Sequence, residues 1–169
     1  MFHIRPYKDG DLRKLNDLYR EFYTLHHRDF SGGRAMSTEG AEASVKEFVV
    51  KEDSWILVAE HDSTQVVGFV RFERRDSCFF GGELFVHLNW RRRGIGTALL
   101  DAQEKWIREH GGNAVYLSVV PANRGMFGFI FKRGYDTLNT VELCKDFDPE
   151  KAARRRSEME FLGLPFKLK

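Results

Sequence analysis

Hydrophobic positions near the N-terminus recur every three or four residues, which is the period of a helix that buries one face. They predict a first helix that Asp9 or Asp11 caps and that runs to about His26, after a short strand over residues 2–6. The apolar stripe of this helix consists of Leu12, Leu15, Tyr19, Phe22 and His26. The chain is therefore expected to begin with a strand followed by a helix that packs on it.

Residues 23–34 lose the helical period and combine aromatic, histidine and charged side chains before the pair Gly32-Gly33. A second helix is expected to begin near Ser37 or Thr38 and to end before residues 51–54. Its buried positions are predicted to be Ala41, Val45, Phe48 and Val49. The segment between the two helices is thus expected to be an aperiodic connection.

The middle of the chain changes to short apolar runs separated by turn residues, a pattern typical of a strand meander. Three strands are expected, over residues 55–60, 66–73 and 79–87. The pair Gly81-Gly82 predicts a bulge in the third strand, because glycine inside a strand marks an irregularity.

A helix is expected after Gly96, ending at residues 110–112 and burying Leu99, Ala102, Trp106 and Ile107. The next apolar run, residues 114–120, is a short strand. Strand, helix and strand form a β–α–β unit, so the strands at 79–87 and 114–120 are expected to be parallel.

The last third of the chain predicts a helix over 124–133 that Gly134 ends, and a strand over 135–147. Asp148-Pro149-Glu150 is expected to cap a charged helix over about 151–160. The apolar tail from Phe161 packs on the body of the protein or covers a partner subunit. These elements predict one domain over 1–147, with 148–169 as a C-terminal helix and tail packed on it.

Composition excludes several classes of protein. The 169 residues are 42% hydrophobic with a net charge of +2, which fits a globular domain and disfavours a dedicated nucleic-acid binder. The run Arg154–Arg156 is interpreted as a solvated helix face, since acids flank it. Two cysteines and no paired ligand spacing predict neither a disulfide framework nor a metal site. No leader and no apolar span of about 20 residues is visible, so a cytoplasmic protein without membrane contact is expected.

The most informative stretch runs from Leu84 to Leu100, where a buried strand meets a helix through a basic, glycine-containing turn. Glycine lets the backbone approach an anion closely, and the backbone N–H groups at a helix start favour negative charge. Three arginines, Arg91 to Arg93, add charge and bidentate donors. The pattern indicates a diphosphate-binding turn rather than an ordinary solvated arginine run.

The order of elements and this turn resemble the GNAT family of N-acetyltransferases, over about Ile4 to Phe147. The motif Arg91-x-x-Gly94-x-Gly96 carries the resemblance, and Asn123 with Gly134-Tyr135 matches a second signature. The resemblance implies a mixed α/β fold. Its twisted sheet is mostly antiparallel, with flanking helices and a central parallel strand pair that splays apart.

The resemblance also implies transfer of an acetyl group from acetyl-CoA to a primary amine by direct attack, without a metal. The acceptor is a small-molecule or peptide amine, and a homodimer is an open possibility. Cofactor-binding residues carried over from the family are Leu84, Phe85, Val86, Arg91, Arg92, Arg93, Gly94, Ile95, Gly96, Thr97 and Asn123.

Glu83 and His87 are the candidate catalytic residues. Glu83 precedes Leu84, where related acetyltransferases often carry an acid, and would take the amine proton directly or through water. His87 shares a strand face with Glu83 and Phe85 by alternation and would relay the proton. The alternatives are a cross-strand salt bridge for Glu83 and a polar strand end for His87.

The general acid is left open, because Ile130 stands where the family frequently has a tyrosine. By location alone the candidates are Tyr116, Ser118, Tyr135 and Cys144, or a bound water. The same isoleucine favours an alternative function, a non-catalytic acyl-CoA-binding or regulatory module. A nucleic-acid-associated factor that uses the arginine clusters is a further alternative.

The family places its acceptor-binding segment between the first two helices. The residues there that would line an amine site are Tyr23, His26, His27, Asp29 and Phe30. Asp29 would attract a cation. The alternative is structural: His26 completes the buried stripe of the helix, and Phe30 anchors a loop.

Overall fold

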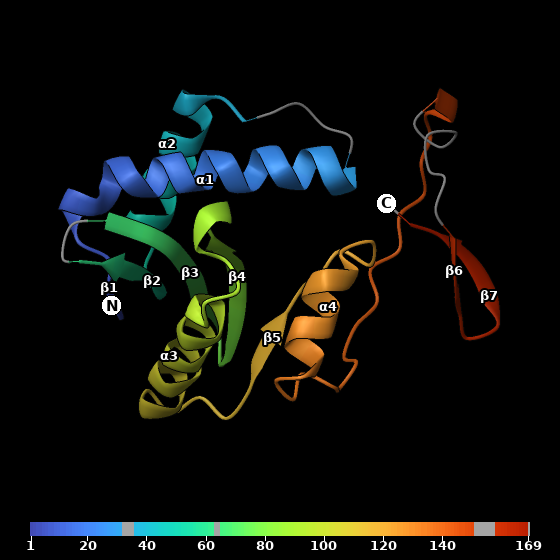
Figure 1. Cartoon of the computed structure of the whole chain (residues 1–169). Helices are drawn as coiled ribbons and strands as arrows, with labels where there is room; N and C mark the ends of the chain where they lie inside the picture. The colour runs from blue at the N-terminus through green and yellow to red at the C-terminus, as the bar shows by residue number, and fades with distance from the viewer. Residues whose placement is uncertain (32–35, 63–64, 151–157, 169) are drawn as a thin grey trace. The chain divides into compact units, whose positions relative to one another are not determined.

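The computed structural model describes residues 1–31, 36–62, 65–150 and 158–168. The chain divides into two compact units, Met1–Ser118 and Val119–Lys169 (Figure 1). The two units are considered separately below.

Five strands form the sheet of the N-terminal unit, in the order β1-β2-β3-β4-β5 (Figure 1). Their bounds are Phe2–Pro6, Ser54–His61, Gln65–Arg75, Cys78–Val86 and Val115–Leu117. Strands β1 to β4 are antiparallel neighbours, whereas β4 and β5 run parallel. The predicted meander and β–α–β unit are confirmed, although β5 is shorter than the expected run over 114–120.

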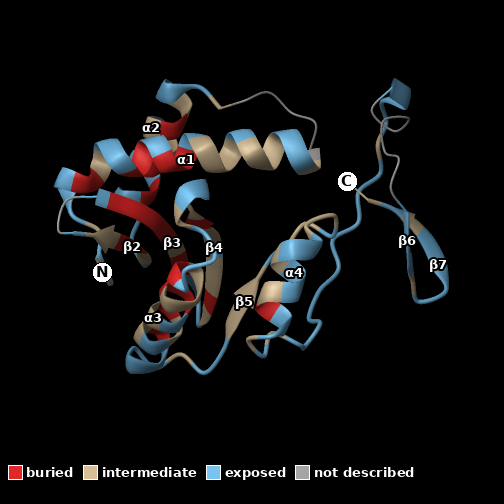
Figure 2. Cartoon of the chain, in the orientation of Figure 1, coloured by how far each residue is buried: buried red, intermediate tan, exposed pale blue. Residues whose placement is uncertain are grey.

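Helices cover both faces of this sheet. Helices α1 (Leu12–His26) and α2 (Thr38–Val50) build one apolar core with β3, and α3 (Ile95–Glu109) builds the other. Strand β3 is buried on both faces, as its continuous apolar run indicates (Figure 2). The predicted fold class, a mixed α/β sheet with flanking helices and a parallel pair, is confirmed.

The start of α2 agrees with the prediction, because the Ser37 hydroxyl accepts a hydrogen bond from the Gly40 N–H at 3.0 Å. Its buried face comprises Ala41, Val45 and Phe48. Val49 is exposed, in contrast to the expectation. In α3, Leu99 and Ile107 are buried, and Ala102 and Trp106 are half-buried against the same core.

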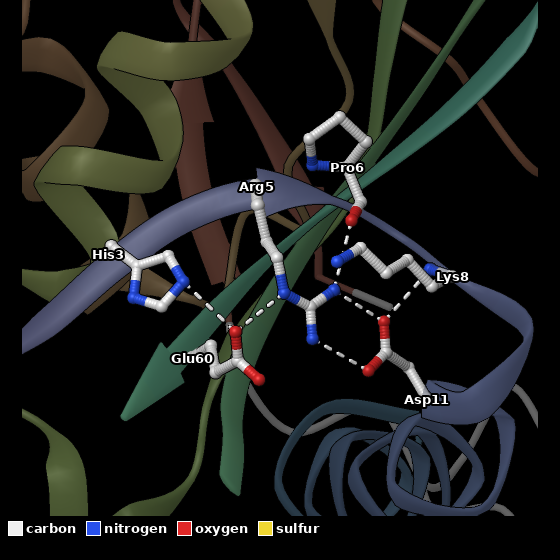
Figure 3. A network of polar contacts seen from close by, with 6 residues as sticks. All are labelled: His3, Arg5, Pro6, Lys8, Asp11 and Glu60. Carbon is white, nitrogen blue, oxygen red and sulfur yellow. Dashed lines mark hydrogen bonds and ion pairs between the residues drawn. The ribbon is translucent and has the colours of Figure 1, made fainter. Parts of the chain in front are cut away.

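Asp11 precedes α1 but does not cap it with its side chain. The carboxylate turns back instead, accepting from the Lys8 N–H at 2.9 Å and from the Arg5 guanidinium at 2.6 and 2.8 Å (Figure 3). Arg5 also donates to Glu60 at 2.7 Å, and His3 pairs with the same carboxylate. The network connects β1, β2 and the start of α1. The side chain of Asp11, predicted to cap the helix, therefore links these elements instead.

Residues 23–31 are helical, which corrects the prediction of an aperiodic connection from residue 23. Helix α1 includes Tyr23 to His26, and a π-helix follows over His27–Ser31. The physical reason is ring packing: Phe22 lies against Tyr23 and His26, and His26 against Phe30. The remainder of the expected connection, residues 32–34, lies outside the described residues.

The predicted bulge in β4 is confirmed. The β3–β4 register passes from Val70–Leu84 to Phe72–Gly81, so β4 contains one extra residue. A Cβ atom on Gly82 would lie 2.8 Å from the Arg71 Cγ, and one on Gly81 would overlap the Leu117 side chain. Both glycines are required here because neighbouring atoms approach the backbone closely.

The C-terminal unit contains α4 (Arg124–Phe131) and a hairpin of β6 (Glu158–Phe161) and β7 (Leu164–Lys167). The hairpin corrects the prediction of a helix to Glu160. Its two-residue loop, Leu162-Gly163, has φ of 52° and 74°, as a type I′ turn requires. Pro149 and Glu150 are helical, with the Asp148 carboxylate accepting from the Glu150 N–H, and the rest of the expected helix, 151–157, lies outside the described residues.

The predicted strand over 135–147 is wrong, since none of these residues is in a strand. The larger aliphatic side chains in this segment, Leu138, Val141 and Leu143, are spaced by three and two residues and are exposed. This spacing does not keep the period of two that places side chains on one sheet face. The apolar residues of this segment therefore do not line one face of a strand, and they are not buried.

We expect Asp11→Asn to lower the free energy of unfolding at pH 7 by about 1–3 kcal/mol, because it removes charge-assisted hydrogen bonds from Arg5. Burial alone would raise the pKa of Asp11, but the bonds from Arg5 and Lys8 outweigh it and hold this pKa below its usual range. Stability from a depressed pKa is present above about pH 4 and is lost as the pH falls through the folded-state pKa.

Urea denaturation at pH 7 and pH 3 measures this effect. Asp17→Asn, on the exposed face of the same helix, is the matched control and should change little. Equal effects of the two substitutions at pH 7 would contradict the role assigned to Asp11.

Candidate active site

The turn between β4 and α3 has the backbone shape that its glycines predict. A 3-10 turn over Leu88–Trp90 follows β4, and Gly94 then adopts φ +81°, in the left-handed region that favours glycine. The Gly94 carbonyl accepts the first helical bond from the Ala98 N–H at 2.9 Å. The N–H groups of the first turn have no partner within their helix, so they and the positive helix end favour an anion.

The three arginines of this turn are exposed. Arg91 donates from Nε to the Val86 carbonyl at 2.9 Å, with its guanidinium over the Phe85 ring at 5.2 Å. Arg93 lies over the Trp90 ring at 4.8 Å. Over the described ranges, none of the three forms an ion pair. Their charge is therefore available to an anionic ligand at the turn.

Strand β4 leaves β5 before it reaches the turn. The parallel pairing covers Phe79 to Gly81 only, whereas pairing with β3 continues to Val86. Residues 84–86 thus have a strand edge on the β5 side that β5 itself does not cover. An extended ligand can bind such an edge as an added strand would.

Glu83 lies at the bulge and is held by two side chains. The Tyr23 hydroxyl donates to Glu83 Oε1 at 2.9 Å, and Arg71 forms an ion pair with the other carboxylate oxygen. The Arg71 guanidinium lies over the Phe48 ring at 4.2 Å, in the space that Gly82 leaves. The cross-strand salt bridge expected as the alternative for Glu83 is therefore present, beside α1.

The hydroxyl of Tyr23 remains protonated over the working range. Burial first, and then the nearby charge of Glu83, raise its pKa to about 12. Burial also raises the pKa of Tyr19, whose hydroxyl hydrogen bonds to that of Tyr23. The two tyrosines act as donors in a chain that ends on the Glu83 carboxylate.

Aromatic and histidine side chains form a continuous strip along α1 and the π-helix. The aromatic strip consists of Tyr19, Phe22, Tyr23, His26, His27 and Phe30. Its inner end is the buried Tyr19, stacked on Phe69 at 5.4 Å. Its outer end is half-buried, where His26 lies 5.6 Å from Phe22 and 5.4 Å from Phe30. Burial and then the neighbouring His27 lower the pKa of His26, so this ring is neutral at pH 7.

His87 faces Glu21 of α1. Its Nε2 lies 3.6 Å from a Glu21 oxygen, and its Nδ1 accepts from the Asn89 N–H at 3.2 Å. Glu83, Phe85 and His87 each meet α1, as their alternation predicts. In the described part of the chain, however, the ion-pair partner of His87 is Glu21 and not Glu83.

Of the predicted acceptor residues, Tyr23, His26, His27 and Phe30 lie in the aromatic strip beside Glu83. Asp29 is exposed and forms two hydrogen bonds with its neighbour Arg28, at 2.6 and 3.1 Å. The same arginine lowers the pKa of Asp29. Its charge is largely neutralised locally, which weakens the predicted role in attracting a cation.

Four residues of this site were missed by sequence reasoning: Tyr19, Glu21, Phe22 and Arg71. The helical spacing of Tyr19, Phe22 and His26 carried a usable signal, but it indicated a buried stripe. Arg71 carried no signal in the sequence. Its partner Glu83 is on a different strand, and the bulge determines which residues of the two strands face each other.

Asn123 belongs to the C-terminal unit, where its Oδ1 accepts from the Met126 N–H at 3.1 Å and caps α4. Ile130 of the same helix is buried. The structure locates two of the candidates for the general acid. The Tyr116 ring lies 5.4 Å from the Phe80 ring, and Cys144 is exposed. The structure adds no acid at the position of Ile130.

The chain belongs to the acetyltransferase (GNAT) family, whose model matches residues 13–135. The resemblance that the turn and the order of elements indicated is thereby confirmed. Membership places the chain among the acetyltransferases.

A curated relative is the uncharacterized N-acetyltransferase YhfO of Bacillus subtilis (strain 168). It is 27% identical over 143 residues, which cover 79% of this chain and 89% of the relative.

Solved structures share the fold. The aminoglycoside N-acetyltransferase AAC(6')-Iy in complex with CoA has a TM-score of 0.70 at 16% identity, over 88% of this chain and 96% of that one. The PaiA N-acetyltransferase of Thermoplasma acidophilum in complex with coenzyme A has a TM-score of 0.65 at 23% identity, over 83% of this chain and 93% of that one.

Among the described residues, none of the helices has the length and hydrophobicity needed to span a membrane. No group of three or more His, Cys, Asp or Glu side chains in the same residues is placed to hold a metal ion.

We expect a coupling energy of about 1–3 kcal/mol between Arg71 and Glu83 in a double-mutant cycle of Arg71→Met and Glu83→Gln. Each single substitution leaves a partly buried charge without its partner, whereas the double variant removes both charges. Urea denaturation of the four proteins measures the cycle. Additive effects would show that the ion pair contributes nothing to stability.

Proposed function

We propose that this chain transfers an acetyl group from acetyl-CoA to a primary amine. The observation that supports this proposal most is the basic turn Arg91–Gly96, which directly follows a strand whose open edge is the part that β5 does not cover beyond Gly81. The turn suits a diphosphate, and the open edge suits an extended amide-containing arm. Coenzyme A contains both a diphosphate and an extended amide-containing arm. The CoA complexes of AAC(6')-Iy and PaiA support coenzyme A as the ligand.

The residues present fit this cosubstrate. Backbone N–H groups and side chains of residues 91–97 would hold the diphosphate, and the edge of 84–86 would hold the pantetheine arm. Asn123 is proposed to contact the arm. Bound acetyl-CoA supplies an acetyl thioester, and a β4 backbone N–H near Phe85 or Val86 would polarise its carbonyl oxygen.

Glu83 is proposed to accept the proton of the amine, directly or through water. Arg71 and Tyr23 each engage one oxygen of this carboxylate and fix its position. Because both oxygens are engaged, the proposal suits an amine that is already partly neutral in solution. An α-amine with a pKa near 8 meets this condition better than a lysine-like amine near 10.4.

His87 and Glu21 form a second proton-carrying pair on the same side of β4. We propose that His87 relays a proton between this pair and solvent, since the two ring nitrogens of an imidazole can accept and donate a proton. The amine attacks directly, and no serine or cysteine nucleophile is assigned.

A non-catalytic acyl-CoA-binding module is the second candidate function. The observation that favours it is the buried Ile130 at the position where the family frequently has a tyrosine. Such a module would bind coenzyme A through the same turn without releasing thiol. An amine screen with thiol release as the readout separates the two functions.

Gly96→Glu should weaken coenzyme A binding by at least about 100-fold, because it sets a carboxylate beside the diphosphate at the helix start. Isothermal titration with coenzyme A measures this. Gly10→Glu, at an exposed glycine with open space around it, is the matched control and should bind normally. Wild-type affinity in Gly96→Glu would remove the turn from the site.

Glu83→Gln should lower kcat/KM at neutral pH by about 100-fold or more and remove the acid limb of the pH–rate profile. Glu21→Gln tests the second pair and should have the smaller effect. The pH dependence of thiol release from acetyl-CoA with a reactive amine is the measurement. If the profile of Glu83→Gln keeps its wild-type shape, Glu83 serves only the ion pair with Arg71.

A further inference from the structure

The proposed function leaves the class of acceptor open, and the environment of Glu83 narrows it. Resting on that function, we infer that the acceptor is a monoamine whose amino group is attached to a flat aromatic or similarly apolar body. Two independent features carry this inference: the rings of the aromatic strip and the charge balance around them.

The aromatic strip offers ring surface next to the proposed base. Tyr23 bonds to Glu83, and from there the strip continues through Phe22 and His26 to Phe30. The outer rings are half-buried, so each still exposes surface to a ligand. A flat apolar group gains about 0.5–1.5 kcal/mol from each such ring contact beyond the area it buries.

The π-helix keeps this surface continuous. Helix α1 would end at His26, but the turn over His27–Ser31 carries Phe30 to within 5.4 Å of the His26 ring. Single π turns are rare in proteins, and those that occur are often at functional sites. The rare geometry thus extends the ring surface by one aromatic residue at its exposed end.

Three carboxylates near the strip have basic partners among the described residues. Glu83 has Arg71, Asp29 has Arg28, and Glu21 has His87 at the longer distance of 3.6 Å. A second or third ammonium group would meet arginines rather than free carboxylates, and like charges at close range are unfavourable.

Glu21 is the least tightly paired of these three carboxylates. Among the described residues its oxygens make long contacts, to the Leu88 N–H at 3.4 Å and to His87, and its side chain is 24% exposed. The site therefore offers little negative charge for a second ammonium group and an apolar ring surface for the remainder of the molecule. His26 adds ring surface without charge, since its pKa is lowered.

The test compares three amines with the acetyl-CoA-loaded enzyme: 2-phenylethylamine, n-butylamine as the aliphatic monoamine, and spermidine as the polycation. Thiol release measures turnover, and calorimetry with the coenzyme A complex measures binding. We expect kcat/KM and affinity for 2-phenylethylamine to exceed those for both other amines by about 10-fold or more. Equal values, a preference for spermidine, or no binding of any amine to the coenzyme A complex would overturn the inference.

Two variants locate the effect. His26→Ala and Phe30→Ala should each raise KM for 2-phenylethylamine by about 2- to 10-fold, and should raise KM for n-butylamine by a clearly smaller factor. Losses that are equal for both monoamines would contradict ring recognition. Coenzyme A titration and thiol release together distinguish the two levels of failure. Without coenzyme A binding, or with coenzyme A binding but no thiol release for any amine, the proposed function is wrong. With thiol release but no preference for 2-phenylethylamine, only the acceptor class is wrong.

Discussion

The close approach of β4 to β5 at Gly81 is the constraint on which the rest of the site depends. At this residue the parallel pairing ends, and directly after it β4 contains its bulge. The bulge turns Glu83 toward α1 and opens the space through which Arg71 reaches it. After the same departure, β5 does not cover the edge of 84–86, so one backbone irregularity serves both the proposed proton acceptor and the edge proposed to bind the cosubstrate.

Helix α1 is fixed at both ends by polar contacts with the sheet, and its stripe of rings lies between them. Asp11 clamps its start to Arg5 of β1, and Tyr23 bonds to Glu83 of β4 near its end. Packing and recognition therefore use the same side chains: the inner rings contribute to the core, and the outer rings are proposed to contact the acceptor. The position of α1 on the sheet consequently sets the distance between the proposed base and the acceptor surface.

Much of the N-terminal unit was predictable because its patterns are local. The strands, α2 and α3 follow from apolar runs, periodicity and caps. Predictions failed where a distant contact replaced the local pattern. Asp11 binds Arg5 instead of capping its helix, and ring packing keeps residues 23–31 helical. The segment 135–147 alternates too irregularly to form a strand, and Gly163 makes a hairpin turn where a charged helix was expected to end.

The sequence by itself determined the family and the shape of the turn that is proposed to bind a diphosphate, since the motif Arg91-x-x-Gly94-x-Gly96 is contiguous and its glycine conformation is a local property. Only the tertiary structure decided the partners of Glu83. Tyr23 is 60 residues away along the chain, and Arg71 faces Glu83 because of a bulge whose register depends on both strands. Such partners depend on how elements pack, and that information is not present in any single stretch of the chain.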